Sequence, residues 1–186
     1  MMFDGLKVLV TGGAGFIGSH IVDDLVMKGA EVIVLDNFSS GKYDNLEMVS
    51  DKISIVEGDI LDGDTLFELT KSIDLISHHA AQLEITSCID DPIEDLRVNA
   101  EGTLRVFEAA RANNVQKVIY ASSACVYGQA EYELQDEGHP KTPNWPYGVS
   151  KYATELYADI YQKYYGIQMV GLRYAIIYGP REWYGR

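Results

Sequence analysis

A tyrosine and a lysine four residues apart, Tyr147 and Lys151, are the residues of this sequence best suited to proton transfer. The pattern around them predicts a helix over residues 147–165, on which this spacing places both side chains on one face. A tyrosine hydroxyl with its usual pKa of about 10 is a poor base at neutral pH, but a nearby ammonium group stabilises the phenolate. The pair therefore predicts a general base assisted by a cation. Such pairs also occur by chance on many helices, so their context has to decide.

Two serines upstream provide part of that context. Ser122 and Ser123 follow an apolar run, residues 117–121, that predicts a buried strand. Ligands of open parallel sheets bind beyond the carboxyl ends of the strands, which is where both hydroxyls would lie. Either serine could share a hydrogen bond with the phenol, and the spacing alone does not choose between them.

A glycine-rich turn near the N-terminus has the pattern of a dinucleotide-binding loop. In the segment Thr11-Gly12-Gly13-Ala14-Gly15-Phe16-Ile17-Gly18, the glycines satisfy G-x-G-x-x-G between an expected strand and an expected helix. Glycines let the backbone approach a pyrophosphate, whose charge is met by free N–H groups at the helix start. A purely structural turn is the alternative.

An acidic residue at the end of the second expected strand favours the dinucleotide interpretation. Asp36 follows Gly18 by 18 residues, which is close to the place of a ribose-binding acid in this motif. Its carboxylate would accept a hydrogen bond from the ribose 2′-hydroxyl and repel a 2′-phosphate. Because no arginine follows Asp36 to offset that repulsion, the sequence predicts NAD rather than NADP as the cofactor.

Apolar runs and helical patterns alternate along almost the whole chain and would position these groups. The runs that suit buried parallel strands are residues 7–10, 31–35, 53–56, 75–77, 117–121 and 168–172. The stretches that suit helices are residues 16–28, 63–71, 92–113 and 147–165. This alternation predicts an α/β fold, a doubly wound parallel sheet of six or more strands with helices on both faces.

Composition and charge narrow the classes of partner. The 186 residues, 47% of them hydrophobic, suffice for one domain with a packed core. A formal net charge of −13 argues against binding to nucleic acid or to an anionic membrane. The sequence has neither a membrane-length apolar stretch nor a basic signal-peptide region, so we expect a cytoplasmic protein. Cys88 and Cys125 are not spaced as metal ligands, which predicts reduced thiols and no metal site.

Taken in order, these motifs resemble the extended short-chain dehydrogenase/reductases of the NAD-dependent epimerase/dehydratase family, in particular its nucleotide-sugar 4-epimerases. The resemblance runs along the whole chain and implies a Rossmann fold. It is carried by Gly12, Gly15 and Gly18 and by residues 35–42, Gly58-Asp59-Ile60, His79-Ala80-Ala81, Asn99 with Gly102-Thr103, residues 122–128, Arg173-Tyr174 and Tyr178-Gly179-Pro180.

The resemblance also implies roles for individual residues. Ser123 would be the catalytic hydroxyl beside Tyr147 and Lys151, with Ser122 as the neighbouring candidate, and Lys151 would also hold the nicotinamide ribose. The residues expected to bind NAD are Gly12, Gly15, Phe16, Ile17, Gly18, Asp36, Asn37, Asp59, Ile60, Ala80, Ala81, Asn99, Tyr147 and Lys151. Among these, Asp59 and Ile60 would border the adenine, although Asp59 also suits a turn or helix cap. His78 and His79 are interpreted as packing residues.

A second implication concerns the reaction. In 4-epimerases of this kind a sugar hydroxyl loses its proton to the tyrosine, a keto-sugar forms, and hydride returns to its other face. Related 4,6-dehydratases carry Asp-Glu before Val-Tyr-Gly, whereas this chain has Ala124-Cys125, which favours an epimerase over a dehydratase, decarboxylase or reductase. Ile176 replaces the asparagine with which the family contacts the sugar nucleotide, so the sugar and the nucleotide stay open.

Family members of this kind are considerably longer than this chain. We therefore expect residues 1–180 to form the NAD-binding domain with the catalytic residues, and residues 181–186 to begin a C-terminal substrate lobe that is missing here. Trp183 and Tyr184 would border the substrate pocket or simply begin that lobe. A truncated, non-catalytic NAD-binding module is the alternative. By the same resemblance, a homodimer would form through the helices over residues 92–113 and 147–165.

Overall fold

Strands and helices alternate in the computed structural model, which describes residues 3–83 and 85–182. The strands are β1 (Lys7–Thr11), β2 (Glu31–Asp36), β3 (Ile53–Glu57), β4 (Leu75–His78), β5 (Lys117–Ser123) and β6 (Gln168–Tyr174). They pair in parallel in the order β3-β2-β1-β4-β5-β6. Each predicted strand begins at the observed residue and ends one or two residues early. The doubly wound sheet is therefore confirmed.

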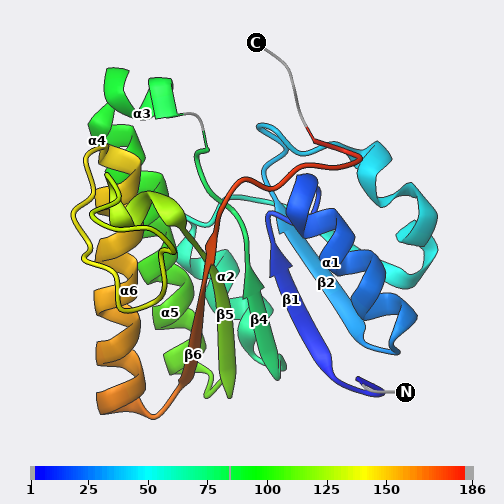
Figure 1. Ribbon diagram of the computed structural model, residues 1–186. Helices are drawn as coiled ribbons and strands as arrows, with labels where there is room; N and C mark the ends of the chain where they lie inside the picture. The colour runs from blue at the N-terminus through cyan, green and yellow to red at the C-terminus, as the bar shows by residue number, and fades with distance from the viewer. Residues whose placement is uncertain (1–2, 84, 183–186) are drawn as a thin grey trace.

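Helices cover both faces of this sheet. The α-helices are α1 (Phe16–Met27), α2 (Gly63–Thr70), α3 (Ile85–Asp90), α4 (Pro92–Asp95), α5 (Thr103–Ala112) and α6 (Pro146–Tyr165), joined by the 3₁₀ segments η1 (Tyr43–Lys52) and η3 (Ala124–Tyr127) and the π-helix η2 (Leu96–Gly102). Figure 1 shows α1 on one side of the sheet and α5 and α6 on the other. Within the described ranges, none of these helices is long and apolar enough to cross a membrane.

The alternation of side chains along the strands divides the core into two layers. On one face of β1, Leu9 belongs to the cluster that contains Phe107 of α5 and Tyr161 of α6. On the other face, Val10 belongs to the cluster that contains Val22 of α1. Burial of β1 on both faces explains why its segment is a continuous apolar run.

One predicted helix is wrong as a single element. The stretch over residues 92–113 is divided into α4, the π-helical η2 and α5. The Asn99 side chain leaves the helix to bond the backbone of Gln82, and the Thr103 hydroxyl donates to the Asn99 carbonyl oxygen over 2.7 Å. These side-chain contacts accompany the widened turn, and such turns are frequent at functional sites.

The chain after β6 crosses the carboxyl end of the sheet and reaches α1 (Figure 1). Two contacts fasten it there: His20 Nε2 lies 3.0 Å from the Pro180 carbonyl oxygen, and the Arg181 guanidinium lies 2.8 Å from the Asp23 carboxylate. Trp183 and Tyr184 lie outside the described residues. The expected start of a further lobe at residues 181–186 therefore stays a prediction.

Candidate functional site

The order of the strands places a crevice between the carboxyl ends of β1 and β4. The chain leaves β1 toward β2 on one side and leaves β4 toward β5 on the other, which is the arrangement that binds ligands in open α/β sheets. The glycine-rich turn follows β1, and Ala80 and Ala81 follow β4. The sequence motifs therefore meet at this edge.

Gly12 brings the two sides of the crevice together. Its φ angle is +68°, in the left-handed region, and its N–H donates to the Leu35 carbonyl oxygen over 2.8 Å. A Cβ atom on Gly12 would lie 2.5 Å from the Ala80 backbone nitrogen, and one on Gly18 would lie 2.1 Å from the Gly12 carbonyl oxygen. Only glycine fits at these two places.

The N-terminus of α1 suits an anion. Gly15 is its N-cap residue, and no side chain of the described residues caps the first turn, which holds no acidic residue. The first N–H groups of a helix have no partner within the helix and carry partial positive charge. The backbone N–H groups of Phe16 and Ile17 at this helix start are donors of the kind that a dinucleotide pyrophosphate requires. The loop therefore fits NAD.

Ala14, in the middle of the glycine loop, is held at both of its backbone polar groups. Its N–H donates to Asp36 Oδ2 over 2.9 Å, and its carbonyl oxygen accepts from Lys42 N at 3.0 Å and from Asn45 Nδ2 at 2.8 Å. The segment after β2 thus fixes the loop from outside. Asn45 carried no signal in the sequence, because no helix or strand was expected around it.

Asp36 is buried at the end of β2. Burial raises the pKa of its carboxyl group, and the N–H groups of Phe38 and Ala14 act in the opposite direction by stabilising the carboxylate. Phe38 N donates to Oδ1 over 2.9 Å, which leaves each carboxylate oxygen a further lone pair. Asp36 is therefore placed and oriented to accept from a ribose hydroxyl.

Asp59 and Ile60 lie next to this site but have internal partners. Asp59 Oδ1 accepts from Leu61 N at 2.8 Å in a turn, and Oδ2 accepts from Asn37 Nδ2 at 2.9 Å. Ile60 is buried and packs against Gly102, where an added Cβ atom would lie only 2.6 Å from Ile60 Cδ1. Asp59 is thus a turn residue that also holds Asn37, and the adenine contact stays a prediction.

Asn99 holds the backbone that continues from Ala80 and Ala81. It is fully buried, and its amide oxygen and nitrogen each bond the backbone of Gln82 over 3.0 Å. Its Nδ2 also donates to Asp95 Oδ1 over 2.7 Å. Asn99 therefore shapes the wall of the crevice, and direct contact with the cofactor stays a prediction.

The two histidines are neutral packing residues. The Thr103 hydroxyl donates to the Asn99 carbonyl oxygen, so it can only accept from His78 Nε2–H, at 2.9 Å. His78 Nδ1 therefore carries no hydrogen and accepts from the Thr11 hydroxyl at 2.6 Å. Burial lowers the pKa of His78 well below its usual value and that of His79 to about 4. Neither side chain is free to exchange a proton at neutral pH.

Ser123, Tyr147 and Lys151 come together at the carboxyl edge of β5. Pro146 begins α6, so Tyr147 lies in its first turn and Lys151 one turn later, with Lys151 Nζ 5.6 Å from the centre of the tyrosine ring. All three side chains are buried, and Ser123 lies near enough to the Tyr147 hydroxyl to stabilise its phenolate. Ser122 points the other way and donates to Glu155 over 2.5 Å. The structure therefore brings Ser123, and not Ser122, to the phenol.

The electrostatics of this group differ from the simplest expectation. Burial raises the pKa of Tyr147, and only the neighbouring Ser123 hydroxyl lowers it. Burial also lowers the pKa of Lys151 to about 8, against the attraction of Asp95 and Cys88. The expected lowering of the tyrosine pKa by Lys151 is thus not found in the chain by itself, where desolvation disfavours the phenolate.

Comparison with known proteins accounts for this arrangement. The sequence model of the NAD dependent epimerase/dehydratase family matches residues 8–186. The chain belongs to this family. The UDP-glucose 4-epimerase of Mycolicibacterium smegmatis is 40% identical over 181 residues, which are 95% of this chain and 58% of that protein.

Solved structures of this family have the same fold. The UDP-glucose 4-epimerase of Thermotoga maritima, solved with UDP-glucose, superposes with a TM-score of 0.92 at 37% identity, over 97% of this chain and 59% of that one. The UDP-glucose 4-epimerase of Thermus thermophilus, solved with NAD, gives a TM-score of 0.90 at 41% identity, over 95% and 57%. The chain thus spans somewhat less than three fifths of the relatives it matches.

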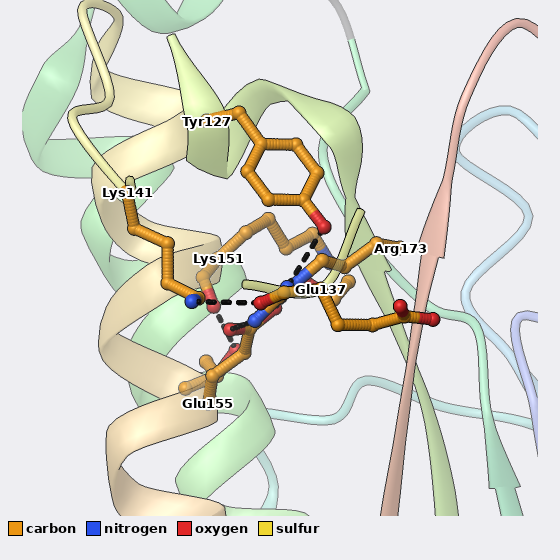
Figure 2. Close-up of polar contacts among 8 residues, drawn as sticks. Tyr127, Glu137, Lys141, Lys151, Glu155 and Arg173 are labelled. Atoms are coloured by element: carbon orange, nitrogen blue, oxygen red, sulfur yellow. Dashed lines mark hydrogen bonds and ion pairs between the residues drawn. The ribbon is translucent and has the colours of Figure 1, made fainter. Parts of the chain in front are cut away.

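A polar network between α6 and β6 was not predicted from the sequence. The Arg173 guanidinium binds the Glu155 carboxylate through Nε and Nη2 at 2.8 and 2.7 Å, and its Nη1 donates to the Tyr127 hydroxyl over 2.8 Å (Figure 2). Two parallel bonds of this kind fix both side chains. The network ties α6 to β6. Arg173 and Tyr127 stood in motifs of the family resemblance, but nothing in the sequence joined them to Glu155.

Proposed function

We propose that this chain is the cofactor-binding and catalytic part of an NAD-dependent nucleotide-sugar epimerase that acts at C4. The observation that carries the proposal is the buried group of Ser123, Tyr147 and Lys151, at the same edge of the sheet as a glycine loop that fits a pyrophosphate. The names of the matched relatives, UDP-glucose 4-epimerases, support the same reaction. NAD rather than NADP follows from the buried carboxylate of Asp36.

The proposed mechanism assigns one task to each residue. Tyr147 takes the proton of the sugar hydroxyl, and Ser123 donates a hydrogen bond that stabilises the resulting negative charge. Bound NAD supplies a reversible hydride acceptor, which lets the sugar carbon become a ketone and then regain hydride on its other face. Lys151 contributes positive charge that favours the phenolate, and Tyr147 returns the proton to the product.

A dehydratase of the same family is the second candidate. Elimination of water requires a further acid and base beside the sugar, and the residues that follow Ser123 are the uncharged Ala124 and Cys125. The Cys125 backbone N–H bonds Ser123 Oγ over 3.1 Å, so this segment positions the serine. Without a carboxyl group here, epimerisation is the better supported reaction.

The sugar nucleotide and the partner subunit belong to the proposal as well. The matched relatives carry about two fifths of their length outside the shared part, and a corresponding lobe would complete the substrate pocket. A homodimer would form through α6 and the neighbouring helices. Exposed apolar side chains on α6, namely Val149, Leu156, Ile160 and Tyr164, form one stripe at helical spacing.

The proposal is tested by proton NMR of sugar nucleotides incubated with the product of the complete gene and NAD. UDP-galactose, UDP-N-acetylglucosamine and UDP-glucuronate are the probes, because the anomeric signals of 4-epimers differ. We expect one probe to give its 4-epimer, and Tyr147→Phe to abolish turnover while NAD affinity, measured by calorimetry, changes less than about threefold. NAD binding without any epimer from these probes would favour the non-catalytic module or another sugar class. Loss of NAD binding in Tyr147→Phe would contradict the assigned role.

A further inference from the structure

A buried carboxylate that no motif singled out lies at the centre of the site. Asp95, the last residue of α4, is only 1% exposed. An ionised carboxylate in such a place requires strong compensation, because transfer from water into the protein interior is costly. Its partners therefore indicate what the group is for.

Both oxygens of Asp95 have side-chain donors, and these lead to the two walls of the site. Oδ2 accepts from the Ser150 hydroxyl over 2.6 Å, and Ser150 directly precedes Lys151 on α6. Oδ1 accepts from Asn99 Nδ2 over 2.7 Å, and Asn99 holds the Gln82 backbone. One carboxylate thus joins the helix of the catalytic residues to the chain that leaves β4.

The same carboxylate is the source of negative charge for Lys151. The titratable groups that interact with Lys151 are His78 from β4, His79 directly after that strand, Cys88 from α3, Asp95 from α4 and, beneath its ammonium group, Tyr147. The histidines are neutral, and burial with the neighbouring Asp95 raises the pKa of the Cys88 thiol to about 12. Asp95 is therefore the one carboxylate among these groups, and its attraction favours the charged form of Lys151.

We propose that Asp95 is a positioning residue of the reaction centre, which orients the Lys151 turn of α6 through Ser150 and keeps Lys151 in its cationic form. The role of Lys151 in turnover rests on the proposed function, whereas the interaction between Asp95 and Lys151 does not. An uncharged residue of the same shape would retain the packing and remove the attraction. Lys151 would then release its proton at lower pH, since burial already disfavours its charge.

The first experiment measures Lys151 directly. In the product of the complete gene with NAD bound, the titration of the lysine side chains is followed by NMR, with Lys151 assigned from Lys151→Met. We expect Asp95→Asn to lower the Lys151 midpoint by about one pH unit or more, a tenfold or greater loss of proton affinity. Asp90→Asn, which changes an exposed carboxylate nearby, is the matched control and should leave the midpoint unchanged.

A second readout follows the reaction and separates the two proposals. With whichever probe sugar nucleotide is turned over, Asp95→Asn should move the alkaline limb of kcat/KM to lower pH. If no probe is turned over, the proposed function fails while the NMR titration still decides the role of Asp95. A folded Asp95→Asn protein with an unchanged Lys151 midpoint would overturn the proposal. If that variant does not fold, Ser150→Ala decides: we expect kcat to fall several-fold with NAD affinity unchanged, and an unchanged kcat would overturn it.

Discussion

Single residues of this site work through partners that lie within the protein. Asp36 illustrates this, because its carboxylate accepts from the backbone of Ala14 in the glycine loop and of Phe38 beyond β2. It thus supports the loop in addition to its proposed contact with the ribose. A change at Asp36 is therefore expected to affect the choice of cofactor and the shape of the loop together.

Asp36→Asn should reduce the preference for NAD. The amide loses the negative charge and presents N–H to one of the two backbone donors, which removes a charged hydrogen bond worth about 1.5–3 kcal/mol. We expect the dissociation constant of NAD to rise by about 10- to 100-fold, while that of NADP stays equal or falls because the repulsion of the 2′-phosphate is gone. Calorimetric titration of both cofactors measures this, with the exposed Asp44→Asn as control. Equal affinities for NAD and NADP in the unmodified protein would refute discrimination by Asp36.

Elements with one dominant signal could be predicted from the sequence. The inner strands β1, β2, β4 and β5 are largely buried and so form apolar runs, which is why their predicted segments begin at the correct residue. The helix that carries Tyr147 and Lys151 has a periodic pattern and a proline at its first turn. Local patterns of this kind are sufficient to place the reaction centre at the edge of the sheet.

Features that depend on tertiary contacts could not be predicted in this way. The division of the helix over residues 92–113 follows from the reach of Asn99 to Gln82, a partner that no period in the sequence reveals. The choice between Ser122 and Ser123 follows from the face of β5 on which each side chain lies. From the sequence, this choice could be made only through the family resemblance. Asp95 lacked a signal because its partners lie on α6 and in η2.

The close contact between the β1 turn and the exit of β4 can be tested with two glycines. Gly12 and Gly5 both have left-handed φ angles, +68° and +77°, but a Cβ on Gly12 would meet the Ala80 backbone whereas one on Gly5 would meet nothing within 4 Å. Alanine at Gly5 should cost only backbone strain, about 1–2 kcal/mol or a few degrees in Tm. Gly12→Ala should lower Tm further and weaken NAD binding at least about tenfold, as measured by thermal melts and calorimetry. Equal effects of the two substitutions would show that the close approach does not matter.

The whole molecule combines a strongly acidic surface with an apolar stripe on one helix. A net charge of −13 opposes close association of identical chains, so an exposed stripe of large apolar side chains stands out against it. The stripe lies on α6, which also packs beside α4, η2 and α5, and Ile93 of α4 is exposed as well. This is the surface on which the proposed homodimer depends.

Charge placed in that stripe should separate the dimer. In the product of the complete gene, Leu156→Glu combined with Ile160→Glu would bury carboxylates without partners, at a cost of several kcal/mol. We expect sedimentation velocity at micromolar concentration to change from a dimer to a monomer, which corresponds to an increase of more than about 100-fold in the dissociation constant. Met48→Glu, at a more exposed apolar residue of η1 on the other side of the sheet, is the control and should leave the dimer intact. A monomeric unmodified protein, or a double variant that stays dimeric, would contradict the assignment of this stripe to the interface. α6 also carries Tyr147 and Lys151 on its buried face. In such a dimer, the helix that joins the two copies would therefore also carry the proposed catalytic residues.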